Sequence, residues 1–408
     1  MIILGIHDGH NSGVSLFIDG ELKFAITEER ISRKKNEYGF PYHAIKYCFK
    51  KNNLKNNDID KIAVSTLNLP PKYFAVKRNT NFLISDYIKE QEEYWYPKIY
   101  ENKKIKYLDV FKNKVLKKKD TYYDLSLVKN EDDMLTLRKV RLNFISDFFK
   151  IDKKDIKFFD HHKCHAYYGY YSSNFQNKKN LAIVTADGGG DDCNGTIWIK
   201  KGHILKQVYK TNICNIGRIY RYATLILGMK PTEHEFKVMG LAGYGLKNTK
   251  YYDYTNKVFA ETLDCKGINF FYKKKPKDLY FYFKKKLQNQ RFDAIAYSIQ
   301  KFTEDILYKW FLNINSKYKV NNFIFSGGVA QNIKATKKIL ENKNIKSIFV
   351  PPGPGDESLC IGAAYCLIAE KNNEKSKKIS TIIPPYTGTS YSKNDLEFIK
   401  NDKKVKIK

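Results

Sequence analysis

The chain has 408 residues, 42% of them hydrophobic and 15% aromatic, which is enough for two lobes with separate cores. No apolar run reaches the roughly 18 residues that span a bilayer, and no basic, cleavable leader opens the chain, so we expect a cytoplasmic protein with no membrane partner. The net charge of +30 favours anionic small substrates. Because lysines are spread along most of the chain, nucleic acid is not the expected partner.

The chain begins with a predicted meander of three short strands, at residues 2–6, 14–18 and 22–27. The turn at 8–13 is polar and contains glycine, so it can present N–H groups to an anion. A dense charge cluster follows at 27–35. Such a cluster is usually a solvated turn, but its place beside the polar turn also allows it to bind an oxyanion.

The next predicted elements are a helix from Pro41 to about Lys51 and a strand at 60–66. Residues 68–147 are rich in Tyr and Lys and poor in Gly, and they end in helical periodicity. We interpret them as a helical insertion on the core. It is either a lid over an acceptor substrate or a segment with a structural role alone.

A strand at 156–159 leads into the sequence Asp160-His-His-Lys-Cys-His165. His161 and His165 are four residues apart, so a helix would place them on one face with Cβ atoms about 5–6 Å apart, and His162 would point elsewhere. Asp187 and Asp356 each follow a predicted strand, at loops that should converge on one side of the core. Two imidazoles and one or two carboxylates suit iron(II), zinc or manganese.

The strand at 181–187 ends in Asp187-Gly188-Gly189-Gly190, a turn that can cradle an anion. Further strands at 196–199 and 204–205 repeat the opening meander, which indicates a duplicated fold. The rest of this half is predicted from periodicity and glycine content: helices at 215–228, 292–315 and 358–370, strands at 322–325 and 345–350, a loop at 233–245, a linker at 384–390 and a helix starting at 392–400.

Glycine loops at strand ends, together with the repeated meander, are typical of the actin/hexokinase/Hsp70-like (ASKHA) fold, an α/β architecture that holds a nucleotide between two lobes. No Walker lysine motif or GxGxxG is present. We therefore expect a first lobe at 1–180 with the insertion at 68–147, and a second lobe at 181–375. A linker and the start of a further domain would occupy 376–408.

Seven elements in this order resemble the nodulation/antibiotic O-carbamoyltransferases of the NodU/CmcH type. They are Gly5 to Ser12, Glu28 to Lys35 (EERxxRxK), His161 to Ala166 (HHxxHA), Asp187 to Gly190, Lys237 to Gly245 (KxMGLAxYG), Ser326 to Asn332 (SGGVAxN) and Pro352 to Ala364.

The resemblance implies a TsaD-like part followed by a YrdC-like domain. The latter makes carbamoyladenylate from carbamoyl phosphate and ATP with Mg, and the former passes the carbamoyl group to a hydroxyl of a sugar, antibiotic or other small molecule. It implies iron(II) on His161, His165 and Asp356, with Asp187 as a possible fourth ligand. It makes His10 the general base, with Lys35 and Arg30 contacting carbamoyl or phosphate groups. The implied nucleotide or carbamoyladenylate site is Asp187, Gly188, Gly189, Gly190, Lys237, Gly240, Ser326, Gly327, Gly328 and Asn332.

The sequence ends at Lys408, where most of the YrdC-like domain would still be expected. We therefore expect that domain either in a longer protein or in a separate chain. Two other functions stay open. One is a TsaD-type tRNA threonylcarbamoyl transferase, suggested by the shared core and the basic charge. The other is a non-catalytic nucleotide-binding module of the same fold.

Overall fold

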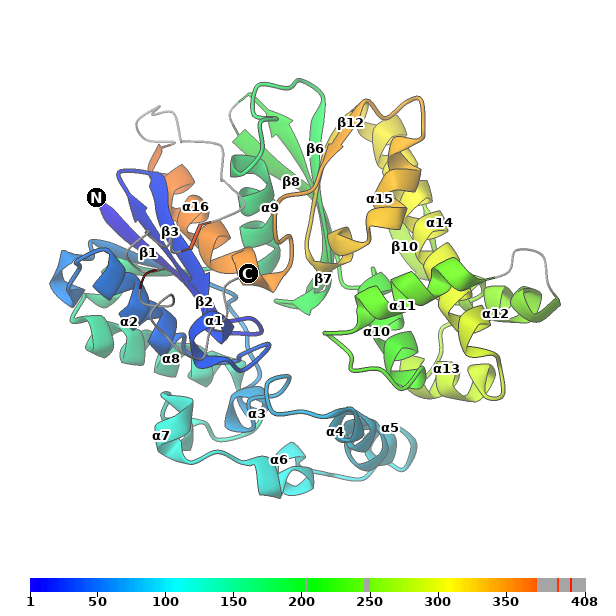
Figure 1. The fold of residues 1–408 in the computed structure, drawn as a ribbon, viewed down its shortest axis with the longest axis horizontal. Helices are drawn as coiled ribbons and strands as arrows, with labels where there is room; N and C mark the ends of the chain where they lie inside the picture. The colour runs from blue at the N-terminus through cyan, green and yellow to red at the C-terminus, as the bar shows by residue number, and fades with distance from the viewer. Residues whose placement is uncertain (203, 246–249, 373–386, 389–396, 398–408) are drawn as a thin grey trace.

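The computed structural model describes residues 1–202, 204–245, 250–372, 387–388 and 397. Its first lobe is built on a five-stranded sheet of order β3-β2-β1-β4-β5 (Figure 1). In the meander β1–β3 the neighbouring strands are antiparallel, whereas β4 and β5 join the sheet in parallel. The strands are β1 (Ile2–His7), β2 (Gly13–Ile18), β3 (Glu21–Thr27), β4 (Lys61–Ser65) and β5 (Ile156–Phe159).

The second lobe repeats this plan with the order β8-β7-β6-β11-β12. Here β6–β8 form the antiparallel meander, and β11 and β12 are the parallel pair. The strands are β6 (Leu181–Gly190), β7 (Cys193–Lys201), β8 (Ile204–Thr211), β11 (Asn322–Ser326) and β12 (Ser347–Phe349). The predicted duplicated α/β fold of the ASKHA type is confirmed by this shared strand order. The predicted strand at 345–350 shortens to three residues at the sheet edge.

Two helices cross between the lobes. Helix α9 (His161–Tyr171) follows the first sheet in sequence but packs on β6 and β11 of the second. Helix α16 (Leu359–Asn372) follows the second sheet but packs on β1 and β4 of the first. The two helices touch each other closely, since a Cβ added to Gly362 would lie 2.2 Å from the Cys164 carbonyl oxygen. A boundary at residue 180 therefore divides the sheets but not these helices.

Other helices cover the outer faces of the sheets. The first lobe is covered by α2 (Tyr42–Lys51) and α8 (Met134–Phe149), which share one buried cluster with β1 and β2. The second-lobe core contains α14 (Phe292–Tyr318), which buries Trp310, and α10 (Ile216–Ile226). Smaller elements are α1 (Glu29–Ser32), η1 (Asn56–Asp58), η5 (Lys153–Asp155), α12 (Lys250–Ala260), β9 (Leu263–Lys266), β10 (Asn269–Tyr272), α13 (Leu279–Leu287), η7 (Gly328–Gln331), α15 (Ile333–Leu340) and η8 (Asp356–Ser358).

Residues between Asn68 and Asp133 form a chain of short helices that reaches from the first lobe toward α13 of the second (Figure 1). Its apolar cluster is completed by Leu225 and Tyr280 of the second lobe. We call this segment the insertion. The last part of the insertion predicted at 68–147 is instead α8, which packs in the first-lobe core. The insertion contains α3 (Pro71–Ala75), α4 (Ile84–Lys89), the π-helix η2 (Glu90–Trp95), α5 (Tyr96–Tyr100), α6 (Tyr107–Val110), η3 (Lys112–Lys114), α7 (Lys118–Thr121) and η4 (Leu125–Leu127).

The predicted loop at 233–245 is wrong, because most of it is helical: α11 (Glu235–Leu241) and η6 (Ala242–Tyr244). Val238 and Ala242, four residues apart, are buried in the second-lobe core and hold the segment in helical form. A side chain at Gly240 would meet only open space, so no contact requires glycine here. This glycine lowers the stability of the helix but does not interrupt it. The predicted linker and final helix lie outside the described residues, apart from 387, 388 and 397. Among the described helices, none has both the length and the apolarity needed to span a membrane.

Candidate active site

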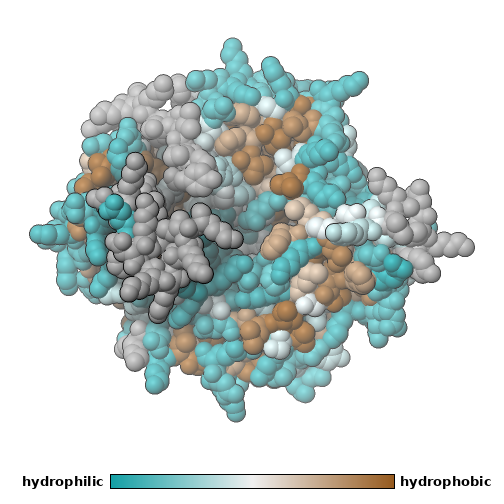
Figure 2. Space-filling view, in the orientation of Figure 1, coloured by the Kyte–Doolittle hydropathy of each residue, from teal (hydrophilic) through white to brown (hydrophobic). Residues whose placement is uncertain are grey.

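A cavity of about 1800 Å³ lies between the two lobes and the insertion. Figure 2 shows mainly hydrophilic residues around the hollow that opens on this face. Turns that follow strands of both sheets line the cavity, as expected where strand ends of an α/β sheet converge. The site residues that line it are His10, Arg30, Lys35, His161, Asp187, Gly188, Gly189, Gly190, Gly328, Asn332 and Asp356.

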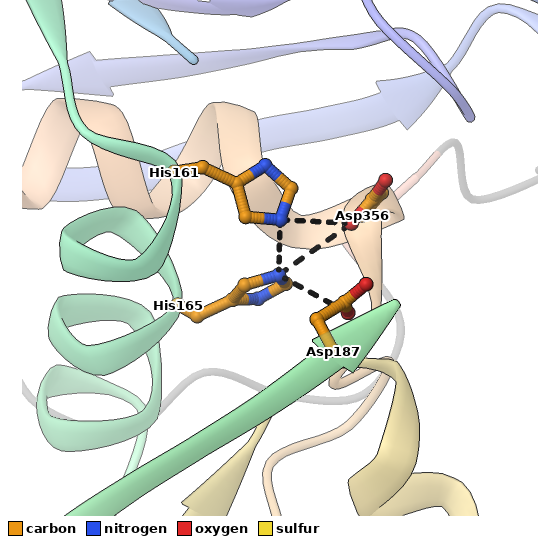
Figure 3. A group of neighbouring side chains, drawn as sticks. All are labelled: His161, His165, Asp187 and Asp356. Carbon is orange, nitrogen blue, oxygen red and sulfur yellow. Dashed lines mark hydrogen bonds and ion pairs between the residues drawn. The ribbon is translucent and has the colours of Figure 1, made fainter. Parts of the chain in front are cut away.

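Four side chains converge at the base of this cavity (Figure 3). They are His161, His165, Asp187 and Asp356, and one ligand atom from each lies within 4.8 Å of all the others. The two histidine Nε2 atoms are 3.2 Å apart. Asp356 Oδ1 lies 3.5 Å from each of them, and Asp187 Oδ2 lies 3.6 Å from His165 Nε2. The structure thus brings together the four residues that the sequence predicted.

The donors fit a divalent metal ion. Ligand atoms at about 2.1 Å from one ion are themselves separated by roughly 3–3.5 Å. The four neighbouring contacts of the cluster, at 3.2–3.6 Å, are close to this spacing. Asp356 Oδ1 is buried and has no hydrogen-bond partner in the described structure, as expected of an atom prepared for a cation. Two imidazoles and two carboxylates suit iron(II), zinc or manganese.

The first ligand histidine is held by groups behind it. Thr66 Oγ1 lies 3.1 Å from His161 Nδ1, which leaves Nε2 to face the cluster. The Asp191 carboxylate accepts three backbone N–H bonds, from His161 at 2.7 Å, Leu67 at 3.0 Å and Asn68 at 2.6 Å. Asp191 therefore orders both the start of α9 and the loop that carries Thr66.

His162 faces away from the cluster, as its helical position predicted. Its Nδ1 lies 2.8 Å from Thr185 Oγ1, on the strand beneath α9. Burial, with added repulsion from the neighbouring His161 and His165, lowers the pKa of His162 well below its usual value. His162 is therefore a neutral core residue that packs α9 on the second sheet.

The charges of the cluster stabilise one another. Burial alone would raise the pKa of Asp356, but His161, His10 and His165 outweigh it and hold this pKa well below the usual range. Burial alone would lower the pKa of His165, but the nearby carboxylates of Asp356 and Asp187 outweigh it and raise this pKa. Both shifts show that the site stabilises an anionic carboxylate beside positive charge.

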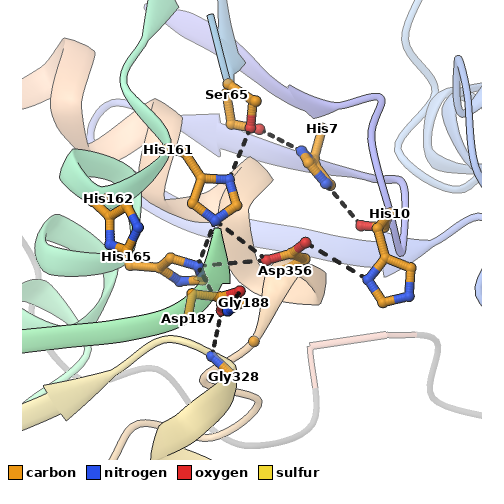
Figure 4. A network of polar contacts seen from close by, with 12 residues as sticks. His7, His10, Ser65, His161, His162, His165, Asp187, Gly188, Gly328 and Asp356 are labelled. Carbon is orange, nitrogen blue, oxygen red and sulfur yellow. Dashed lines mark hydrogen bonds and ion pairs between the residues drawn. The ribbon is translucent and has the colours of Figure 1, made fainter. Parts of the chain in front are cut away.

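The loop between β1 and β2 places His10 next to the cluster (Figure 4). His10 Nδ1 is 3.6 Å from Asp356 Oδ2, and its Nε2 is buried with no hydrogen-bond partner among the described residues. His7 fixes the loop, because its Nδ1 lies 2.7 Å from Ser65 Oγ and its Nε2 lies 2.8 Å from the His10 carbonyl oxygen. Burial lowers the pKa of His7 to about 4, so this ring is neutral near pH 7.

A buried ion pair anchors the same loop from the other side. Arg141 of α8 donates to both oxygens of Asp8, at 2.6 and 2.8 Å, and Tyr123 OH donates to Asp8 at 2.5 Å. Sequence reasoning missed these residues and His7. Tyr123 and Arg141 are 115 and 133 residues from Asp8, so no local pattern links them to the loop.

The glycine turns bring backbone close to the cluster. Gly188 and Gly328 each donate an N–H to a different oxygen of Asp187, both at 2.5 Å. A Cβ on Gly190 would lie 2.3 Å from His161 Cγ, so only glycine fits against that ring. Arg218, another residue that the sequence did not indicate, donates to the Gly188 carbonyl at 2.8 Å and lines the cavity. It adds a positive charge beside the turn predicted to hold phosphate.

The other predicted residues either line the cavity or lie outside it. Lys35 lines it and lies 3.2 Å from Glu233, which links the first lobe to the second. Of the described residues, four predicted for the nucleotide lie outside the cavity lining: Lys237, Gly240, Ser326 and Gly327. Lys237 is exposed on α11, whereas Gly327 takes a φ of +91° that only a glycine adopts easily and donates to the Pro354 carbonyl behind the turn.

Two lobes with one strand order, and a histidine–carboxylate cluster in the cleft between them, define a two-lobed α/β protein of the ASKHA class. The chain belongs to the family described as "Carbamoyltransferase N-terminus", which matches residues 2–365.

Individual proteins extend this comparison. The uncharacterized protein MJ1051 of Methanocaldococcus jannaschii is 28% identical over 404 residues, which cover 98% of this chain and 63% of that protein. The nodulation protein NolNO of Sinorhizobium fredii is 24% identical over 366 residues, covering 88% of this chain and 46% of that protein. The chain thus spans between about half and two thirds of these curated relatives. Component A of the Acidaminococcus fermentans (R)-2-hydroxyglutaryl-CoA dehydratase aligns with a TM-score of 0.45 at 13% identity, over 91% of this chain and 99% of that one.

Proposed function

We propose that the chain is the transfer part of an O-carbamoyltransferase. It takes the carbamoyl group of carbamoyladenylate and passes it to a hydroxyl of a small-molecule acceptor such as a sugar or an antibiotic. Carbamoyladenylate comes from carbamoyl phosphate and ATP with Mg, in a YrdC-like domain in the same protein or in a separate chain. Membership of the carbamoyltransferase family supports the reaction class.

The observation that carries the proposal is the position of His10. Its Nδ1 faces Asp356 at 3.6 Å, and its buried Nε2 is left without a hydrogen-bond partner in the described structure. A hydroxyl is a poor nucleophile until a nearby base removes its proton, and an imidazole is suited to this role near neutral pH. His10 is such a base, at the edge of the cluster.

In the proposed step the acceptor oxygen attacks the carbamoyl carbon and its proton moves to His10. The new O–C bond forms as the bond between the carbamoyl carbon and the AMP oxygen breaks, and AMP leaves with the electron pair. Arg30, Lys35 and the N–H groups of the 187–190 turn bind the adenylate phosphate, whose charge they complement. His161, His165, Asp187 and Asp356 would hold a divalent ion, iron(II) by family resemblance, and this ion would supply Lewis acidity at the site.

The test is to give the purified chain synthetic carbamoyladenylate with candidate acceptors and to measure AMP release and the mass of the product. His10→Ala should lower the rate by about 10²- to 10⁴-fold, the usual contribution of a general base. His43→Ala, at an exposed histidine of α2, is the matched control and should keep the parent rate. The proposal fails if His10→Ala and the parent release AMP at the same acceptor-dependent rate.

A further inference from the structure

The insertion forms a wall of the same cavity that holds the cluster. Tyr73, Glu90, Gln91, Trp95 and Ile99 all line it. One continuous space therefore joins these side chains to His10 and Asp356, although the insertion is remote from the cluster in sequence.

This wall is fixed to the second lobe. Phe281 of α13 packs edge-on against Tyr96 and Tyr100, with ring centroids 5.1 and 5.7 Å apart. Lys284 Nζ lies 2.6 Å from Glu92 Oε1 at the rim of this contact. The wall is thus formed jointly by both lobes and presents side chains in defined positions.

Gln91 is the unsatisfied group of this wall. It is only 3% exposed, and its Oε1 has no hydrogen-bond partner in the described structure. Both carboxylate oxygens of its neighbour Glu90 already accept hydrogen bonds. Arg78 donates to them at 2.9 and 2.7 Å, and Tyr107 OH donates at 3.1 Å. A buried amide oxygen without a donor costs free energy, so its retention points to a ligand that donates to it.

The local backbone gives a second, independent sign. Glu90–Trp95 is a π-helix, a rare geometry that occurs mostly as a single turn inside an α-helix and often at functional sites. It brings both Gln91 and the half-buried Trp95 to the cavity. The same cavity is also lined by Tyr222 of α10, which packs on the apolar cluster of the insertion, and by Glu235 of α11, whose Oε1 accepts the Thr232 N–H at 2.7 Å.

Gln91 Oε1 and the Glu235 carboxylate are hydrogen-bond acceptors, so their partner must carry O–H or N–H groups. Trp95 and Tyr222 line the cavity as aromatic residues, and an aromatic ring can pack against the flat side of a small ring. A phosphate or a carboxylate has acceptor oxygens only and would leave Gln91 unsatisfied. A ligand at Gln91 must therefore donate a hydrogen bond, unlike the phosphate predicted at the 187–190 segment.

We propose that the Gln91 end of the cavity is the acceptor subsite, and that it takes a ring bearing several hydroxyl or amino groups, with a donor to Gln91 Oε1 and a face against Trp95. This inference rests on the proposed function, since it assigns the hydroxyl-bearing substrate of that reaction to one end of the cavity.

The test is a fluorescence titration of the 408-residue chain with two probes, myo-inositol and D-glucosamine. Trp198 and Trp310 are buried in the second lobe, so a saturable change on probe binding reports Trp95 and should vanish in Trp95→Phe. Gln91→Leu should weaken binding about five- to tenfold, the loss of one hydrogen bond. Gln91→Glu keeps an acceptor and should favour the cationic D-glucosamine over myo-inositol.

Glu93→Gln, at an exposed position of the same π-helix, is the control and should bind as the parent does. Two outcomes overturn the subsite: neither probe gives a saturable change in the parent, or Gln91→Leu binds as tightly as the parent. Because the titration needs no metal or carbamoyl donor, it separates this inference from the proposed function. Probe binding that depends on Gln91, in a protein that never transfers a carbamoyl group, would refute the reaction and keep the binding site.

Discussion

Asp191→Asn should weaken metal binding at the candidate site without changing any of its four proposed ligands. In the native protein Oδ1 accepts the N–H of Asn68, and Oδ2 accepts those of Leu67 and His161. An asparagine keeps one acceptor oxygen and turns an NH2 group toward at least one of these donors. The loss of one or two bonds to a charged acceptor costs about 2–4 kcal/mol in the free energy of unfolding.

The same change frees the start of α9 and the Thr66 loop, which together orient the ring of His161. A loss of support behind a ligand typically lowers metal affinity by about 10- to 100-fold. Denaturant unfolding and titration with zinc(II) or iron(II) measure the two effects, with the exposed neighbour Asp192→Asn as control. If Asp191→Asn binds metal as tightly as Asp192→Asn, the carboxylate does not position the ligand and the reasoning is refuted.

Three further changes test other parts of the site. The pKa of His165 is raised, and a metal binds only the neutral ring, so protons compete with the metal as the pH falls. Apparent metal affinity, measured by competition with a chelating dye, should therefore drop between about pH 8 and about pH 6. A flat profile would contradict this. Arg141→Met leaves the buried Asp8 carboxylate without its cation and should lower the free energy of unfolding by about 3–5 kcal/mol, measured with denaturant. A loss under about 1 kcal/mol would show that the ion pair does not anchor the loop. Gly190→Ala puts a methyl group 2.3 Å from His161 Cγ, so metal affinity should drop at least about tenfold, and parent-like affinity would mean that the ring has room to move.

The sequence predicted those parts of the fold and site that depend on local patterns. Two meanders with the same turn chemistry indicated the duplication, and the helical spacing of His161 and His165 indicated their common face. Asp187 and Asp356 could be added because strand ends of an α/β core converge. Each of these inferences needs only a few neighbouring residues and one general rule of packing.

The missed parts depend on contacts between distant segments. Asp8 and Arg141 are 133 residues apart, and neither has a sequence signal for its partner. The glycines at 233–245 favour a loop, but burial of Val238 and Ala242 in the second-lobe core makes most of the segment helical. The unsatisfied state of Gln91 also appears only when the whole wall of the cavity is assembled.

The crossing helices explain why the cluster sits between the lobes. His161 and His165 belong to α9, which packs on the second sheet, and Asp187 lies near the carboxyl end of β6 in that sheet. Asp356 begins the short turn that leads into α16, which packs on the first sheet, the sheet that also carries His10. The cluster therefore spans elements tied to both sheets, and the proposed base His10 lies on the side of Asp356. A change in the angle between the lobes would shift His10 and Asp356 together relative to His161 and His165. The fold thus couples the geometry of the cluster to the width of the cleft between the lobes.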